Sequence, residues 1–459
     1  MQPSWAVPEM QGAQVWDPRC RRSLAVICTA LAQQPGISFS RACGTSRKAA
    51  HRILRHQEVT ASGLLSGHVQ ETVKRCAGLP LVLAASDTTP FDFSGHTATK
   101  NLGPISNRPR QQGFLTHSVL AMTPEGVPLG LLYQSSWTRD PDAWGQSDQR
   151  KKRQAQDKES HKWIEAQEGV EAALPTEQPV LVINDREADI FDFLAAPRRK
   201  NTHLLIRAAQ PRRVQVLGGD GKPQSLFVAA ANAPIVACQS VEVGRKPDRP
   251  ARQAHLTIRL AQVQVLPPVA RAKKEGLVAV PVWLVRACEE TPSEGVEPIE
   301  WVLLCTLPIA DGAEAAQIVE YYAKRWQIER FHYTLKSGCA VEALQIDDGL
   351  ALRKILSLYS VVAWWLLYLT FLARKEPDHP AEELLEAPAL AVLEHANRKP
   401  VRTAADIVDA VSRLGGFRRV PSAPTPGVKS LWIGLRRLYD MVAGWQLACK
   451  ALSPPTGQD

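Results

Sequence analysis

Two short apolar runs that each end in an aspartate constrain the fold of this chain more than any other feature of its sequence. The first run, LVLAAS, precedes Asp87, and the second, PVLVIN, precedes Asp185. Runs of this length are typical of buried strands, and strand-like and helical segments alternate around them up to residue 207. This alternation predicts an α/β domain, in which ligands bind where strands end. Both aspartates are therefore candidates for holding a divalent cation, although each has the alternative role of capping a turn.

The remainder of the chain divides into helical and β-rich parts. Residues 1–75 carry apolar residues at helical spacing, and SRACGTSRKAAHRILRH reads as a short helix, a glycine turn and a basic helix with Arg47 and Lys48. This pattern favours a helix-turn-helix that binds DNA, but an ordinary helical hairpin has the same pattern. Residues 208–298 are β-rich without a clear helix and predict an antiparallel insertion, whereas residues 376–459 are helical again.

Basic residues recur in clusters along the whole chain. There are 55 Lys and Arg against 46 Asp and Glu, which gives a formal net charge of +9. One cluster alone is typical of a solvated face, but their recurrence predicts an extended surface that binds a phosphate backbone. The clusters occupy residues 19–22, 47–48, 52–55, 150–153, 198–200, 212–213, 271–274 and 418–419.

The sequence favours a soluble protein in a reducing compartment. The run ILSLYSVVAWWLLYLTFL at 355–372 has 18 uncharged residues, which barely meets the length of a membrane span. It contains several hydroxyl groups and has no second such run beside it, so we expect a buried core helix and no membrane partner. The nine cysteines form no C-x-x-C pair, and the N-terminus lacks the pattern of a signal peptide.

The segment EYYAKRWQIERFHYTLKSG carries the most specific pattern in the chain. We expect one continuous helix over 314–337, on which Tyr322, Arg325, Glu329 and Lys336 lie at offsets 0, 3, 7 and 14. At about 100° per residue these four side chains share a face about 60° wide. Such a face suits phosphate chemistry, with a carboxylate for metal, cations for phosphate oxygens and a hydroxyl donor. The alternative is a charged stripe held by an i,i+4 ion pair.

With the two aspartates upstream, this spacing resembles that of bacterial DDE transposases of the insertion-sequence-four family. The segments ASDTTP, NDREADI and Y-x2-R-x3-E-x6-K are specific in combination, and similar segments cover nearly the full length. Further examples are DPRCRRS, HSVLAMTPEGVPLGLLYQ, KESHKW and EWVLLCTLP. The chain departs from the family after Glu342, where Ala343 and Leu344 replace expected basic residues.

The resemblance implies an α/β fold with an RNase H-like catalytic core, an inserted antiparallel β-domain, and helical N- and C-terminal domains. It assigns a DNA-end-binding domain to 1–75, the catalytic domain to 76–375 with its insertion at 208–298, and a dimerisation domain to 376–459. We expect the apolar seam of that dimer to be formed by Leu431, Trp432, Leu435, Leu438 and Tyr439.

The resemblance also implies the site residues. Two Mg²⁺ ions, for which Mn²⁺ substitutes, would be held by Asp87, Asp185 and Glu329. Trp301 would stack on a base flipped out of the DNA, assisted by Trp326. The remaining DNA contacts would be made by Tyr322, Arg325, Lys336, Arg207, Arg212, Arg47 and Lys48.

The implied function is that of a DNA transposase in the bacterial cytoplasm, associated with the nucleoid. Its partners would be transposon-end DNA, target DNA and a second copy of the chain in a synaptic homodimer. Two alternatives remain open from the sequence. One is a metal-dependent DNA endonuclease of the same fold without strand transfer, and the other is a catalytically silent DNA-binding inhibitor.

Overall fold

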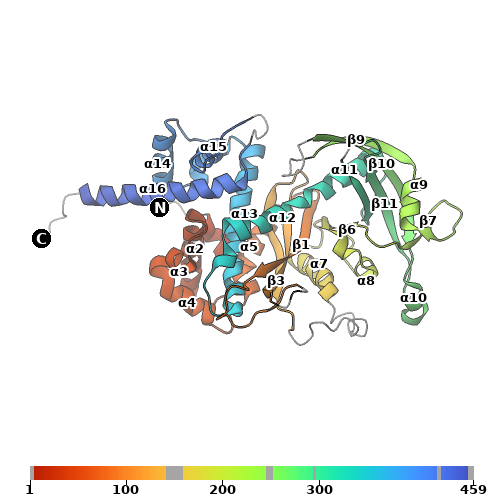
Figure 1. Cartoon of the computed structure of the whole chain (residues 1–459), viewed down its shortest axis with the longest axis horizontal. Helices are drawn as coiled ribbons and strands as arrows, with labels where there is room; N and C mark the ends of the chain where they lie inside the picture. The colour runs from red at the N-terminus through yellow and green to blue at the C-terminus, as the bar shows by residue number, and fades with distance from the viewer. Residues whose placement is uncertain are drawn as a thin grey trace.

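The computed structural model describes residues 5–106, 108, 110–140, 159–243, 252–292, 296–420 and 425–452. In this part of the chain the strands form one mixed sheet of 12 strands. Helices from both ends of the chain gather at one end of the sheet, and the β-rich segment forms the other end (Figure 1). The predicted α/β class is thereby confirmed.

The first five long strands form the part of the sheet that carries the aspartates. Strand β1 pairs antiparallel with β3 and parallel with β5, and β5 pairs parallel with β6, so the order is β4-β3-β1-β5-β6. Gly126, at φ +93°, makes the turn between β3 and β4. The bounds are β1 (Val82–Asp92), β2 (Gly103–Pro104, an edge strand on β3), β3 (Gln112–Met122), β4 (Pro128–Trp137), β5 (Val180–Asn184) and β6 (Thr202–Arg207).

The segment 208–298 forms antiparallel strands, as predicted, and they continue the same sheet beyond β6. They are β7 (Arg213–Val216), β8 (Gln224–Ser225), β9 (Ile235–Val243), β10 (Arg252–Val265) and β11 (Val280–Cys288), joined to β6 through β12 (Glu300–Cys305). The expectation that this segment has no helix is wrong. Helix α9 (Leu226–Asn232) forms because Leu226, Ala229 and Ala230 are buried at helical spacing, and α10 (Val269–Glu275) ends at the left-handed Gly276.

Residues 5–75 are largely helical, as predicted. Asp17, Ser38 and Thr60 cap three of the helices with side-chain oxygens that accept backbone N–H groups. The short helix, glycine turn and basic helix of the proposed helix-turn-helix are all present. The elements are α1 (Ala6–Gln11), α2 (Pro18–Gln33), α3 (Phe39–Cys43), α4 (Arg47–Arg55) and α5 (Ala61–Cys76).

The apolar run 355–372 is the centre of α13 (Gly349–Lys375), which packs against α2, α5 and β4. Among the described helices, this one alone is both long enough and apolar enough to cross a membrane. However, 94% of its most apolar 18-residue stretch is buried inside the protein. The structure therefore agrees with the predicted core helix. Lys354 near its start donates to the carbonyls of Leu54 and His56, which fastens the end of α4 to α13.

The remaining helices flank the sheet or follow α13. They are α7 (Lys162–Ala173), α8 (Phe191–Ala195), α11 (Gly312–Lys324), α12 (Trp326–Tyr333), α14 (Ala387–Asn397), α15 (Ala404–Leu414) and α16 (Val428–Leu452). The charged helical pattern of the sequence over 147–173 predicts a helix that includes α7, and its first part, up to residue 158, lies outside the described residues. The sequence pattern of residues 188–194 predicts a helix, but α8 is shorter than this, because Asp185 caps a 3₁₀ turn ahead of it.

The expected dimer seam on α16 is wrong in its residues. Leu431, Trp432, Leu435, Leu438 and Tyr439 are all buried within their own chain. A close approach of α16 to α15 explains this burial, because a Cβ at Gly434 would overlap the carbonyl of Val411. The second half of α16 instead extends beyond the other elements (Figure 1), where its large apolar residues are exposed. These are Met441, Trp445, Leu447 and Leu452.

Candidate active site

Asp87 and Asp185 occupy matching positions on neighbouring parallel strands. The register pairs Ala85 with Ile183, and the Ser86 hydroxyl donates to Asn184 Oδ1 at 2.5 Å, so the two aspartates come next along both strands. Asp185 ends β5 as expected. Asp87 does not end β1, which continues to Asp92 because β3 pairs with its full length. The pairing of β1 with β5 does stop before Asp87, so both carboxylates still lie where the parallel pairing ends.

The pKa values of the two aspartates are shifted in opposite directions. Burial raises the pKa of Asp185, and the nearby Asp87 carboxylate raises it further. For Asp87, burial also acts to raise the pKa, but His332, Arg325 and the Thr88 N–H together outweigh it and lower the pKa. The ionised form of Asp185 therefore destabilises the folded, metal-free chain, and a cation bound between the two carboxylates would offset this destabilisation.

Glu329 lies on α12, which packs against β1 and β3. The guanidinium of Arg325 hydrogen-bonds its carboxylate, so the i,i+4 pair expected as the alternative reading is present. Among the described residues, no three acidic, histidine or cysteine side chains stand close enough together to hold a metal ion as arranged. The chemistry of Asp87 and Asp185 fits a divalent cation, and Glu329 would have to move toward them to complete the set.

The prediction of one continuous helix over 314–337 is wrong. The helix breaks at Arg325, whose N–H bonds the carbonyl of Tyr322 three residues back in a tighter turn. Past Tyr333 the backbone widens into a π-helical turn that holds Lys336, because the Cys339 N–H reaches the Thr334 carbonyl. Regular angles of about 100° per residue therefore do not hold across the four predicted site residues.

The aromatic candidates lie at the junction of the two helices and β12. Trp301 is half-buried and meets Tyr322 edge to face, with ring centroids 5.2 Å apart. Tyr322 is buried, and burial raises the pKa of its hydroxyl. Trp326 is 54% exposed. The structure thus brings Trp301, Tyr322 and Arg325 together and leaves Trp326 open to solvent.

The basic residues predicted to contact DNA differ in the groups of their own chain to which they are bound. Arg207 donates to the Glu300 carbonyl at 3.0 Å. Arg212 forms an ion pair with the buried Asp189 at 2.6 Å, so a DNA contact by Arg212 requires that pair to be shared. Lys336 lies 3.7 Å from Glu342.

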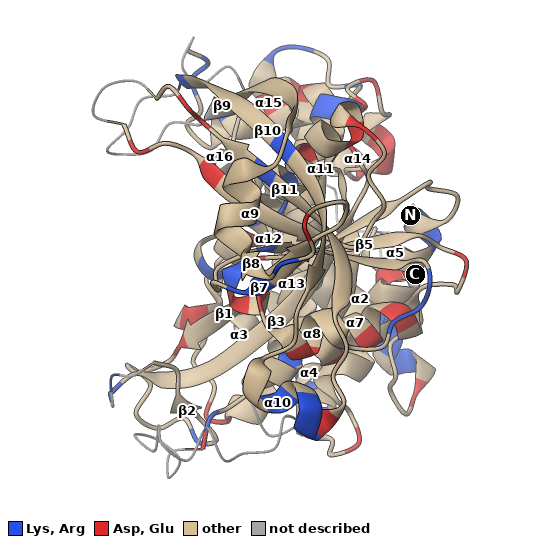
Figure 2. Ribbon diagram, turned by 90° about the vertical axis from the view of Figure 1, so that its right-hand side faces the viewer, with Lys and Arg blue, Asp and Glu red and all other residues tan. Residues whose placement is uncertain are grey.

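The described basic clusters do not form one continuous free surface, and the cluster at 150–153 lies outside the described residues. Figure 2 shows Lys and Arg spread over several elements, α10 among them, with acidic residues between them. Arg212, Arg271 and Arg419 from these clusters are each bound to a carboxylate of the chain. On α4, by contrast, Arg47 and Lys48 are exposed, and no described carboxylate pairs with either. The unpaired basic face of α4 is therefore the part of the predicted surface that the structure supports best.

Comparison with known families identifies two parts of the chain. Residues 148–365 match the model "Transposase DDE domain", and residues 2–59 match the model "Transposase DNA-binding". The chain carries a DDE transposase domain. It is accordingly a metal-dependent enzyme that cleaves DNA and transfers strands, and its helices α2 to α4 lie in the DNA-binding match. A solved structure similar to the chain is the cryo-EM structure of the piggyBac transposase synaptic complex with hairpin DNA. It is 8% identical with a TM-score of 0.36, over 99% of this chain and 79% of that one.

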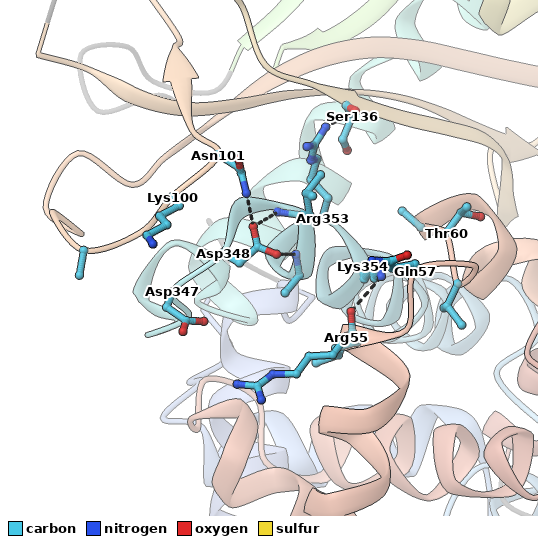
Figure 3. A pocket seen from close by; sticks show the side chains of 16 residues that line it. Arg55, Gln57, Thr60, Lys100, Asn101, Ser136, Asp347, Asp348, Arg353 and Lys354 are labelled. Carbon is cyan, nitrogen blue, oxygen red and sulfur yellow. Dashed lines mark hydrogen bonds between the residues drawn. The ribbon is translucent and has the colours of Figure 1, made fainter.

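Between the DNA-binding helices and the rest of the transposase lies a pocket of about 690 Å³ (Figure 3). Its rim is formed by the end of α4, the start of α5, the segment before β2 and the start of α13. Asp348 caps α13 and also binds the Asn101 amide at 2.7 Å. The charged side chains that line the pocket are Arg55, Lys100, Arg353, Lys354, Asp347 and Asp348.

Two buried histidines beside Asp87 are absent from the set predicted from sequence. His332 Nδ1 lies 3.6 Å from Asp87 Oδ2, and His117 Nδ1 lies 2.8 Å from the Thr88 hydroxyl. The position of His332 could have been predicted from the sequence, because it follows Glu329 by three residues and therefore lies beside it on the helix surface. His117 stands in the segment HSVLAM, and only the pairing of β1 with β3 places it next to Thr88.

Proposed function

We propose that this chain is a cut-and-paste transposase of the insertion-sequence-four family, similar to the transposon-five transposase. It binds the ends of its insertion element, excises the element through a hairpin intermediate and joins the 3′ ends to target DNA. One observation carries the proposal: in a chain with a DDE transposase domain, Asp87 and Asp185 meet on adjacent strands beneath the helix that bears Glu329. The strands β4-β3-β1-β5-β6 then constitute the RNase H-like core, and 208–298 the inserted β-domain.

Asp87 and Asp185 hold the metal ions in this proposal, and Glu329 completes the set after it exchanges Arg325 for a cation. Two Mg²⁺ ions held by these carboxylates, for which Mn²⁺ would substitute, would polarise the scissile phosphate and lower the pKa of an attacking water. Arg325, released from Glu329, and Lys336 bind phosphate oxygens. Nicking, hairpin closure, hairpin opening and strand joining are all in-line phosphoryl transfers, so one set of carboxylates serves each step and no covalent protein nucleophile is required.

The products of cleavage distinguish this function from that of an endonuclease. A labelled end fragment incubated with Mg²⁺ should give a nick first, then a hairpin, and a joined product when target DNA is present. An endonuclease of the same fold gives nicks and breaks alone, and a silent DNA-binding protein gives none of these products.

Replacing Trp301 by alanine should reduce hairpin formation about 5- to 150-fold while nicking continues. Only the hairpin requires a base to leave the stack, and stacking on an aromatic ring returns about 1–3 kcal/mol per base. The measurement is the ratio of nicked to hairpin product on a denaturing gel. Trp283, a half-buried tryptophan on the next strand, is the matched control, and Trp283→Ala should leave the ratio unchanged. Equal loss of nick and hairpin in Trp301→Ala would reduce Trp301 to a packing residue.

End DNA binds the basic face of α4 in this proposal, and the backbone continues into the pocket beside it. Arg55 on α4 and Lys100 across the pocket are exposed, and no described carboxylate pairs with either. Arg55→Gln and Lys100→Gln should each weaken end binding and reduce the slope of log K against log salt by about 0.9. Lys222→Gln, an exposed lysine in the turn before β8, should keep the wild-type slope. Wild-type slopes in both pocket variants would remove the pocket from the DNA path.

Assembly as a homodimer that bridges two ends completes the proposal. The exposed apolar residues of the second half of α16 replace the buried residues of the first half as the contact between subunits. We place the enzyme in the bacterial cytoplasm, where its substrate DNA lies in the nucleoid.

A further inference from the structure

His332 connects the two halves of the candidate active site. It lies on α12 three residues after Glu329, close to one helical turn, so the two side chains project from neighbouring positions. Its Nδ1 lies 3.6 Å from Oδ2 of Asp87 on β1. The residue therefore contacts one candidate metal-holding carboxylate while it belongs to the helix that carries another.

Burial restricts what the imidazole of His332 can do. The residue is 5% exposed, and its Nε2 is buried without a hydrogen-bond partner among the described residues. The tautomer with its hydrogen on Nδ1 directs this N–H toward the Asp87 carboxylate, whose Oδ2 lies 3.6 Å away, and we assign that tautomer on this ground. A buried polar group without a partner is costly, so the Nδ1 contact determines how the ring is oriented.

Asp87 is restrained from two sides. Its Oδ1 accepts the Thr88 N–H at 2.8 Å, and its Oδ2 faces His332. The Thr88 hydroxyl in turn lies 2.8 Å from the buried His117. The 3.6 Å contact with His332 is an ion-pair distance, longer than a hydrogen bond, so the lone pairs of Oδ2 remain available to a cation.

We propose that His332 is a positioning residue, whose Nδ1–H orients the Asp87 carboxylate and fixes α12, with Glu329, against β1. The inference rests on the proposed function, because it takes Asp87 to be a metal-holding residue. Groups that orient metal-holding side chains typically account for about 10- to 100-fold in metal affinity. His332 should therefore act on metal affinity in the absence of DNA.

Two polar substitutions test which ring nitrogen matters. In His332→Asn the amide nitrogen occupies the position of Nδ1, and in His332→Gln it occupies that of Nε2. Mn²⁺ is titrated calorimetrically into the full chain without DNA, and thermal unfolding verifies that each variant is folded. His332→Gln should weaken Mn²⁺ binding about 10- to 100-fold, and His332→Asn should stay within about threefold of wild type. The control is His203→Gln, which changes a half-buried histidine near the start of β6, at the end of the strand away from Asp185. This variant should bind Mn²⁺ as the wild type does.

The outcomes separate this inference from the function on which it rests. Wild-type Mn²⁺ affinity in His332→Gln, or equal weakening in the Asn and Gln variants, overturns the positioning role. Loss of binding in Asp185→Asn together with full binding in His332→Gln overturns that role alone and leaves the metal site standing. Unchanged binding in Asp185→Asn overturns the metal site and the role of His332 with it. If His332→Gln does not fold, His332→Ala replaces it, and the positioning role then requires added imidazole to restore Mn²⁺ affinity.

Discussion

Asp185→Asn and Asp87→Asn should both abolish DNA cleavage while they change the stability of the metal-free chain in opposite directions. Removing one hydrogen-bond donor that stabilises a transition state costs about 10²–10³ in rate, and loss of a metal-holding carboxylate should cost at least that much. Asparagine keeps the shape and the capping role, since its side-chain oxygen still accepts the Glu187 or Thr88 N–H. Loss of cleavage then reports loss of charge, and end-DNA binding should survive because α4 is untouched.

The opposite stability effects follow from the two pKa shifts. The pKa of Asp185 is raised by burial and by Asp87, so its ionised form destabilises the folded state at neutral pH, and Asp185→Asn should raise the Tm. The pKa of Asp87 is lowered because His332 and Arg325 outweigh burial, so its charge stabilises the folded state above its unfolded pKa. That contribution is lost as pH falls through the lowered pKa, and Asp87→Asn should lower the Tm at neutral pH.

Unfolding curves of the metal-free chain with and without Mn²⁺ measure both effects, and the labelled end fragment measures cleavage. Asp92→Asn is a matched control, because Asp92 lies on the same strand and is exposed at its end. It should change neither cleavage nor Mn²⁺-dependent stabilisation. Normal cleavage by Asp185→Asn in Mg²⁺ would reject its assignment to the metal site.

The strands that carry the aspartates could be predicted from sequence because burial on both faces requires continuous apolar runs. The same runs predicted that β1 stops at Asp87. Its continuation to Asp92 depends on pairing with β3, which is a partner distant in sequence, and no local pattern reports it. The adjacency of Asp87 and Asp185 was predictable as a consequence of parallel pairing, whereas the contact of Asp87 with His332 depends on how α12 packs on the sheet.

The errors on the helices have the same physical origin. The four residues of the Tyr322–Lys336 pattern were predicted on one regular helix, but the tight turn at Arg325 and the π-helical turn near Lys336 alter their directions. Apolar residues at helical spacing on α16 indicate only that one face is buried. They do not indicate whether the chain itself or a second copy covers it, and here α15 and the core of the same chain cover the first half.

Cleavage in trans is the second prediction with a large expected effect. Helix α4 is fastened to α13 by Lys354, so DNA held on α4 has a fixed direction relative to the acids of the same chain. A dimer that bridges two ends then brings each end to one set of acids only, and we expect it to be the partner's set. Glu329→Gln removes the acid and keeps DNA binding, whereas Arg47→Ala with Lys48→Ala removes end binding and keeps the acids. Each variant alone should be inactive on end DNA.

Mixing the two variants in equal amounts should restore cleavage from background to about a quarter of the wild-type level per site. Half of the dimers are then mixed, and in each of these one of the two sites joins a functional α4 to a functional set of acids in trans. The measurement is hairpin formation on the labelled end fragment, with mixed dimers verified by two different affinity tags. A mixture of Glu329→Gln with the triple variant Glu329→Gln, Arg47→Ala, Lys48→Ala is the control and should stay at background. Mixed dimers that form and still do not cleave would mean that each α4 delivers its DNA to its own acids, since in that arrangement neither subunit of the mixture has both parts.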